Sequence, residues 1–465
     1  MTLDPVGTLD IDPLIDDPDT RIVVCCGSGG VGKTTTAAAL GLRAAERGRK
    51  VVVLTIDPAR RLAQSMGIDS LDNTPRRVKD IAATGEAAGG ELHAMMLDMK
   101  RTFDEIVEAH ADRERAQAIL SNPFYQSLSA GFAGTQEYMA MEKLGQLRSR
   151  DEWDLIVVDT PPSRSALDFL DAPKRLGSFL DGKLIRVLMA PAKVGGRAGM
   201  KFLNVGMSMM TGALGKLLGG QLLRDVQTFV AAMDTMFGGF RTRADATYKL
   251  LQAPGTAFLV VAAPERDALR EAAYFVERLA AERMPLAGLV LNRVHGSGAD
   301  RLSAERALAA AENLDERGIV DQTDGKKDVR TTTATTTATT AATTATDPAS
   351  ASAPASAPDP TSDSASDPAS DSASATGSPA AAEQPSDPTA EQLTAEQLTA
   401  GLLRLHAERM QVVAREQRTR DRFTALHPEV AVTEVAALPG DVHDLAGLRD
   451  IGERLAAGDT PAGAA

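Results

Sequence analysis

One short stretch, Gly27 to Thr34, constrains the fold of this chain more than any other. Its sequence GSGGVGKT fits the spacing G-x-x-x-x-G-K-[ST] and follows a short β-branched run, Arg21 to Cys26. An alanine-rich stretch comes next, so a strand, a loop and a helix are expected in that order. This is the order of a phosphate-binding P-loop, in which glycines let successive backbone N–H groups turn toward phosphate oxygens. A glycine-rich turn that matched the motif by chance would not need a strand before it and a helix after it.

The motif also predicts which groups hold a nucleotide. Lys33 is expected to reach the outer phosphates, and the Thr34 hydroxyl is expected to bind Mg²⁺. The N-terminus of the following helix adds free N–H groups and the positive end of its dipole. The predicted ligands are therefore ATP and Mg²⁺, and the predicted nucleotide-binding residues of the loop are Gly29, Gly30, Val31, Gly32, Lys33, Thr34 and Thr35.

Two aspartates follow strand-like runs elsewhere in the chain. Asp57 comes just after the run KVVVLT, and Asp159 closes the run DLIVVD. Ligands of α/β sheets bind at the carboxyl ends of the strands, and an aspartate there can hold Mg²⁺ through water. Either residue alone could be a turn or helix-cap residue. Together with the P-loop they predict a phosphoryl-transfer centre in an α/β domain with a mostly parallel sheet flanked by helices.

These three segments resemble one known family. The loop, the DPA at Asp57–Ala59 and the DTPPS at Asp159–Ser163 are similar to the arsenical pump-driving (ArsA) and guided-entry tail-anchored-protein ATPases. These are dimeric ATPases with a deviant P-loop. The likeness covers roughly residues 20–300 and resumes at roughly 400–457.

The resemblance implies a role for several residues. Asp57 would orient or activate the attacking water, with Lys33 as the second catalytic residue, and Asp159 would be the magnesium-linked switch residue. Asn292, in the run LVLNRV, would recognise adenine through its side-chain amide. The implied activity is ATP hydrolysis by a homodimer, or by a heterodimer with a related subunit.

The chain departs from the family pattern at three places. Ser28 stands where members usually carry a second loop lysine, which reaches the partner's phosphates, and Arg164-Ser165 replaces a Gly-His pair in the switch motif. Serine brings no charge, so a homodimer should hydrolyse ATP poorly unless Arg60, Arg61 or Arg164 substitutes. The two cysteines, Cys25 and Cys26, lie in the first strand and are expected on opposite sides of it, in or near the core. Zinc or metalloid binding through cysteines, as the family's branches use it, is therefore not expected.

The expected organisation alternates pieces of the ATPase core with other segments. The core pieces are 20–100, 151–173, 251–318 and 389–457, the last being a helix with the final strand and loop. The other segments are a disordered acidic N-terminus (1–19), a helical segment (101–150), a Met-rich helical subdomain (174–250), a disordered loop (319–388) and a tail (458–465). The loop joins two helices, and its stretch 331–388 lacks any Val, Ile, Leu, Met or aromatic residue, so it cannot bury enough apolar surface to fold.

The segment from Lys174 to Arg224 is basic, whereas the rest of the chain is acidic. It carries nine Lys or Arg against one acidic residue, whereas the whole chain has a net charge of −13. It also holds five methionines, which accept varied apolar partners. Two interpretations stay open. The segment is either a groove for a hydrophobic helix, a lipid-like ligand or a membrane partner, or an internal helical core that uses methionine.

Composition narrows the function and the compartment. The acidic balance argues against nucleic acid as the main partner. The acidic start shows no secretory signal, and no apolar run approaches the ~20 residues that span a bilayer, so a cytoplasmic protein is expected. The main hypothesis is an ATPase that couples nucleotide state to a hydrophobic client or membrane partner. The alternatives are an ATPase that drives anion or metalloid transport, and a weakly hydrolysing regulatory subunit of a paralogous ATPase.

Overall fold

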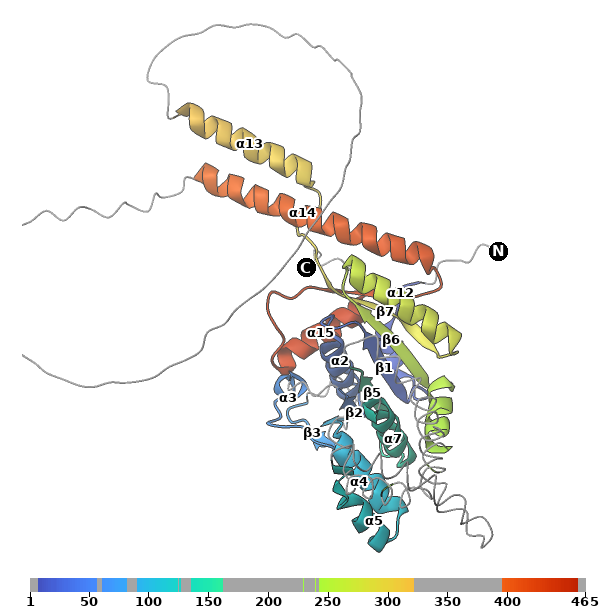
Figure 1. Ribbon diagram of the computed structural model, residues 1–465. Coiled ribbons are helices and arrows are strands. Elements are labelled where there is room, and N and C mark those ends of the chain that lie inside the picture. Colours follow the sequence, from blue (N-terminus) through green and yellow to red (C-terminus); the bar gives the residue numbers. More distant parts are fainter. Residues whose placement is uncertain are drawn as a thin grey trace, which may run out of the picture. The chain divides into compact units, whose positions relative to one another are not determined.

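A computed structural model describes residues 7–56, 61–81, 90–123, 125–126, 135–161, 229, 239, 242–321 and 395–458 (Figure 1). The strands are β1 (Ile22–Gly27), β2 (Lys50–Thr55), β3 (Arg76–Arg77), β4 (Glu91–Met96), β5 (Leu155–Asp159), β6 (Thr256–Ala262), β7 (Leu286–Val294) and β8 (Val432–Ala436). The helices are α1 (Ile11–Asp16), α2 (Lys33–Glu46), α3 (Arg61–Ser65), α4 (Met99–His110), α5 (Arg113–Leu120), α7 (Thr135–Ser149), α12 (Arg266–Ala281), α13 (Ala304–Asp321), α14 (Ala395–Leu426) and α15 (Leu445–Ala457).

The strands form one eight-stranded sheet in the order β3-β4-β2-β5-β1-β6-β7-β8. All neighbours are parallel except the short edge strand β3, which pairs antiparallel with β4. The central strands β1, β2 and β5 are almost continuous runs of buried apolar residues, as expected for parallel strands that are covered on both faces. The prediction of a mostly parallel sheet flanked by helices is confirmed.

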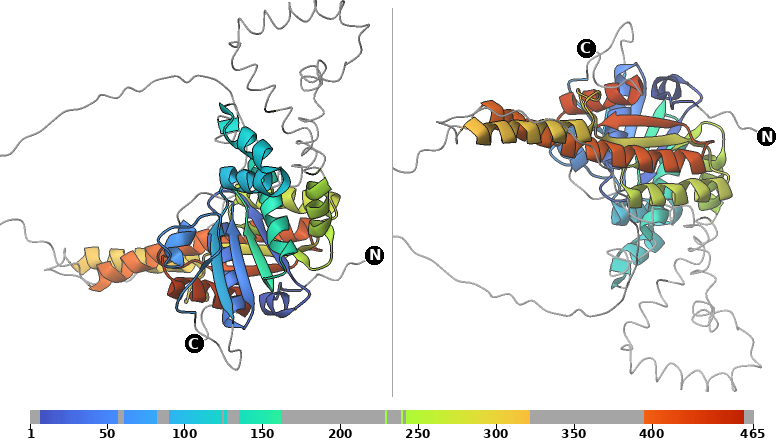
Figure 2. Two further views of the ribbon diagram at one scale, coloured as in Figure 1. Left: turned by 90° about the horizontal axis from the view of Figure 1, so that it is seen from below. Right: turned by 90° about the horizontal axis from the view of Figure 1, so that it is seen from above.

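Two apolar clusters lie on opposite faces of this sheet. One contains side chains of α2, α15 and α1, and the other contains side chains of α7 and α12. The right-hand view of Figure 2 shows α12 and α15 on opposite sides of the strands. Cys25 belongs to the first cluster and Cys26 to the second, and both are buried. The prediction that the two cysteines point to opposite sides of β1 within the core is therefore confirmed.

Residues 7–19, for which the acidic composition predicts disorder, are ordered in the structure. They include α1, whose Ile11 and Ile15 are fully buried, and an isolated bridge between Thr8 and Val432. The reason lies in α2, where Arg43 donates two hydrogen bonds to the Asp12 carboxylate. The acidic residues are thus paired with basic ones on a neighbouring helix, and the two isoleucines anchor the segment.

Arg49, the residue before β2, also holds this N-terminal segment in place. Its guanidinium is buried and donates to four backbone carbonyls, those of Ile15, Asp17, Thr20 and Asp154, at 2.6–3.1 Å. Burial, the largest effect, lowers the pKa of the guanidinium from its ordinary value, and nearby aspartates oppose the shift. Because each carbonyl offers lone pairs, this arrangement gives the buried donors partners without a direct contact to any carboxylate among the described residues.

The predicted helical segment 101–150 contains most of α4, which begins at Met99, and all of α5 and α7. Asp98 and Asp112 cap α4 and α5, because each side chain accepts a backbone N–H three residues on. His110 shares its helical face with Phe103, Ile106 and Val107, and this pattern favours a core position for it. The structure shows otherwise: His110 ends α4 and is exposed, with Nδ1 2.9 Å from the Ile106 carbonyl oxygen.

The chain divides into two compact units, residues 1–307 with 405–465, and residues 308–404. In the smaller unit, parts of α13 and α14 lie side by side, with Ala311 and Ala400 fully buried and an ion pair between Arg404 and Asp315. α13 continues to Asp321, past the predicted boundary at 319. The rest of the low-complexity loop lies outside the described residues. So does nearly all of the Met-rich segment, apart from positions 229 and 239 and a helix over residues 242–252.

Candidate nucleotide site

The loop between β1 and α2 has a backbone that requires glycine. Gly30 and Gly32 have positive φ angles of 76° and 95°, a conformation that side chains other than glycine rarely adopt. A Cβ at Gly27 would lie 2.1 Å from the Val261 carbonyl oxygen, and one at Gly32 would lie 2.2 Å from Nδ2 of Asn292. A Cβ at Gly30 would meet no described atom within 4 Å, so the loop is open there with respect to the described residues. A loop tight against the protein on one side and open on the other suits a bound anion.

Lys33 begins α2 and turns back over this loop. The residue is only 5% exposed, and Nζ donates a hydrogen bond of 2.7 Å to the backbone oxygen of Ser28. The ammonium group is therefore held inside the curve of the loop, near the N-terminus of α2. A positive charge, the helix dipole and free N–H groups converge on one point, which favours a multiply charged anion.

Thr34 and Asp159 meet at the carboxyl ends of two neighbouring strands. Thr34 Oγ1 donates to Oδ2 of Asp159 at 2.7 Å, and Asp159 is fully buried at the end of β5. Thr55, at the end of β2, donates to the same oxygen at 2.9 Å. A hydroxyl and a carboxylate are oxygen ligands of the type that Mg²⁺ takes in phosphoryl-transfer sites. The donor set therefore fits a magnesium ion.

Thr55 is a member of this cluster that the sequence motifs do not identify. It is 1% exposed, and its register in β2 pairs it with Asp159 in β5. A threonine at the end of a strand is common for its β propensity alone, so its hydroxyl is uninformative in the sequence. Only the pairing of two strands that are about a hundred residues apart places it on the carboxylate.

Asn292 lies against the loop from β7. Its Nδ2 donates to the Val31 carbonyl oxygen at 2.8 Å, and the residue is buried. The structure thus brings Asn292 beside the predicted nucleotide residues, in contact with the P-loop backbone. Its recognition of adenine stays a prediction.

The remaining predicted positions divide into two groups. Gly29 is exposed on the loop, and Thr35 is half-buried in the first turn of α2. Asp57, Arg60 and the switch residues 163–165 lie outside the described residues, as does the side chain of Arg61. The structure therefore assembles the loop, Thr34, Asp159 and Asn292 into one site, and it describes β2 up to Ile56, the residue before Asp57.

The thiols of Cys25 and Cys26, in the strand that precedes the loop, have low reactivity. Burial raises the pKa of Cys26 to about 12. Burial, followed by the negative charge of Asp159, raises the pKa of Cys25 well above its usual value. Both thiols are therefore protonated at neutral pH and are poor metal ligands or nucleophiles. Within the described residues no three His, Cys, Asp or Glu side chains gather in a metal-binding group.

Comparison with known proteins decides the family. A model of the ArsA-type anion-transporting ATPases matches residues 20–316, which is more than half of the chain. The chain belongs to the anion-transporting ATPase family. The resemblance inferred from the P-loop, the DPA and the DTPPS segments is thereby confirmed.

Individual curated proteins are similar to this chain at modest identity. ATPase GET3 of Malassezia globosa is 28% identical over 38% of this chain and 50% of its own length. Protein Rv2184c of Mycobacterium tuberculosis is 33% identical over 35% of this chain and 39% of its own. ATPase GET3 of Podospora anserina is 24% identical over 64% of this chain and 81% of its own. The chain thus spans half or less of the first two relatives. No helix in the described part of this family member is both long and apolar enough to cross a membrane.

Proposed function

We propose that this member of the anion-transporting ATPase family binds and hydrolyses ATP with Mg²⁺ in the cytoplasm. The observation that carries the proposal is the 2.7 Å contact between the Thr34 hydroxyl and the Asp159 carboxylate, beside the inward-turned Lys33. The loop amides of residues 29–35 would bind the phosphates, and Lys33 would bind the outer ones. Thr34 and Asp159 would hold Mg²⁺, which when bound offsets negative charge on the phosphate oxygens.

Two further roles complete this proposal. Asp57 follows the end of β2 by two residues, and we assign it the task of orienting the attacking water. Asn292 would read the adenine ring, since its amide carries both a donor and an acceptor. Calorimetry with MgADP and MgATP on the folded chain tests the binding step. Binding that weakens when EDTA removes Mg²⁺ supports the proposal, and no measurable binding would contradict it.

Ser28 bears on how the chain hydrolyses ATP. It is buried at the base of the loop, and its backbone oxygen accepts the Lys33 hydrogen bond. A hydroxyl at this position adds no charge for a partner's phosphates. We therefore propose that the chain works in a dimer, and that a related subunit with a loop lysine supplies the missing cation.

We expect the pure chain to turn over ATP slowly, and Ser28→Lys to raise kcat. A cation supplied in trans contributes ~10³–10⁵-fold in such chemistry, so a gain of at least about 10²-fold is expected at protein concentrations that favour a dimer. Steady-state hydrolysis is the measurement, with unfolding temperature as a check that the larger side chain is accepted. Brisk turnover by the native chain without a gain in the variant would rule out the missing-cation hypothesis.

The coupled partner is proposed to be a hydrophobic client or a membrane protein. The basic, methionine-rich sequence from Lys174 to Arg224 supports this, as does the similarity to proteins named ATPase GET3. We expect Met207, Met209 and Met210 changed together to Ser to lose binding of an apolar fluorophore, whereas the same three changed to Leu keep it. Equal binding by both triple variants, with folding intact, would favour an internal core instead.

Two other functions have specific support. The family's description as anion-transporting ATPases favours an ATPase that drives transport through a membrane partner, and stimulation of hydrolysis by arsenite would support it. The serine at position 28 favours a regulatory subunit that binds ATP and hydrolyses it weakly. A chain that binds MgATP normally but stays inactive after Ser28→Lys would support this last function.

A further inference from the structure

The carboxyl end of β2 is the part of the sheet that leads to the proposed water-directing residue. The ladder of β2 with β4 and with β5 ends at Thr55. Ile56, which is 2% exposed, makes one more contact with the neighbouring strand, because its N–H donates to the Asp159 carbonyl oxygen at 3.0 Å. The Ile56 carbonyl lies beyond the end of the strand ladder. Because a buried carbonyl needs a hydrogen-bond donor, its donor must come from another element.

Gln136, in the first turn of α7, supplies that donor. Its Nε2 lies 2.8 Å from the Ile56 carbonyl oxygen, across 80 positions of sequence. The Ile56 carbonyl is thus held by a helix that belongs to neither the P-loop nor the switch segments. The contact needs a hydrogen-bond donor at the end of the side chain. Glu has the same shape as Gln, but an ionised Glu carboxylate presents only acceptors.

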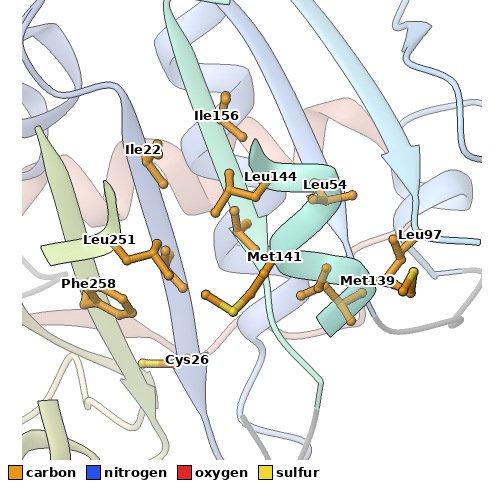
Figure 3. Packing of buried hydrophobic residues seen from close by; sticks show 14 of the residues in the cluster. Ile22, Cys26, Leu54, Leu97, Met139, Met141, Leu144, Ile156, Leu251 and Phe258 are labelled. Carbon is orange, nitrogen blue, oxygen red and sulfur yellow. The ribbon is translucent and has the colours of Figure 1, made fainter. Parts of the chain in front are cut away.

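α7 is itself firmly held, so it can serve as a fixed reference for that carbonyl. Met139, Met141 and Leu144 are buried against the sheet, as Figure 3 shows. The Glu142 carboxylate, also buried, accepts hydrogen bonds at 3.0 Å from Nε of Arg243. Lys143 donates to Glu105 of α4 at 2.9 Å. A helix with this many buried contacts does not follow small movements of a loop end.

We propose that Gln136 is a positioning residue for ATP hydrolysis: it holds the Ile56 carbonyl and so sets the direction in which the chain enters position 57. The inference rests on the proposed function, because it gives Asp57 the water-directing role. Gln136 does not touch the nucleotide-binding groups described above. Its loss should therefore lower kcat and leave MgATP affinity unchanged.

The test is a series at position 136 measured by single-turnover hydrolysis, which resolves slow rates. We expect Gln136→Met and Gln136→Glu to lower the rate by roughly 10–100-fold, the size of effect that small misplacements of a reacting group produce. The dissociation constant of MgATP and the unfolding temperature should stay near the native values. Gln146→Met is the matched control on the same helix, because the half-buried Gln146 side chain makes no hydrogen bond within the described part of the chain. This control should keep the native rate.

A second arm asks whether Gln136 acts through position 57. In an Asp57→Asn background, Gln136→Met should cost little further rate, because the group it positions is already lost. Equal losses in both backgrounds, or a native rate in Gln136→Met, would overturn the inference. Failure of the proposed function has a different signature, in which Asp57→Asn hydrolyses ATP as fast as the native chain.

Discussion

Lys33→Ala is expected to remove nucleotide binding while leaving the fold intact. Lys33 is buried, with only 5% of the residue exposed, and its Nζ donates a hydrogen bond of 2.7 Å to the Ser28 backbone oxygen. A charge at this position should interact with phosphate oxygens in a partly dehydrated site, where electrostatic interactions are stronger than in water. Loss of the charge should weaken MgATP binding by about 100-fold or more, or roughly 2.7 kcal/mol, and should lower turnover further.

Calorimetry and steady-state hydrolysis measure this effect. Lys249→Ala is the matched control, since Lys249 is an exposed lysine on the helix over residues 242–252. The control should bind and hydrolyse as the native chain does. If Lys33→Ala binds MgATP with native affinity, the loop does not hold the outer phosphates through this lysine, and the proposed site is wrong.

The parts of the site that sequence could predict are the local ones. The P-loop is continuous in the chain, and its glycines, its lysine and its first helical hydroxyl are fixed by spacing alone. The positive φ angles of Gly30 and Gly32 are what the motif requires. Asp159 was also predictable, because a buried run of β-branched residues ends in a charged one.

The contacts between distant segments were not predictable in the same way. The sheet order places β5 between β1 and β2, and only this order brings the Thr34, Thr55 and Asp159 side chains together. One sequence does not determine strand order, since many orders satisfy the same hydrophobic patterns. Gln136 is a stronger case, because a polar residue in the first turn of a helix ordinarily faces solvent.

The ordered N-terminal segment shows that amino-acid composition alone can also mispredict disorder. Six aspartates in the first twenty residues suggest a solvated tail, yet Asp12 pairs with Arg43 of α2, and Asp16 pairs with Arg47, the residue that follows α2. The two buried isoleucines of α1 are too few to give a pattern in the sequence. The local density of negative charge therefore predicts disorder, although arginines from another part of the chain pair with these aspartates and hold the segment in an ordered conformation.

Arg243→Ala should strongly destabilise the protein, because Arg243 is the cation of a buried carboxylate. Arg243 lies on the helix over residues 242–252, and its Nε donates to both oxygens of Glu142 on α7. The Glu142 side chain is only 3% exposed, and the Tyr138 hydroxyl also donates to it. Burial, followed by the charge of Glu142, raises the pKa of Tyr138, so the hydroxyl keeps its proton throughout the physiological range.

Removing the arginine leaves a buried carboxylate without its cation. Breaking a buried ion pair in this way costs roughly 3–5 kcal/mol, because the remaining charge is neither solvated nor neutralised. Reversible urea unfolding, followed by circular dichroism, measures the loss as a lower midpoint. Arg270→Ala is the control, since Arg270 pairs with Asp267 where both side chains are more than 70% exposed, and such pairs contribute about 0–1 kcal/mol.

A second variant separates the lost charge from the lost packing. Arg243→Met combined with Glu142→Gln removes both charges and keeps the approximate shapes, so most of the stability should return. The Gln amide can still accept the hydrogen bond from Tyr138. If the double variant is as unstable as Arg243→Ala, the ion pair is not what holds α7 to this helix, and shape complementarity at the contact is the larger contribution. α7 would then depend on its apolar face and on the Lys143–Glu105 ion pair for the rigidity that positions Gln136.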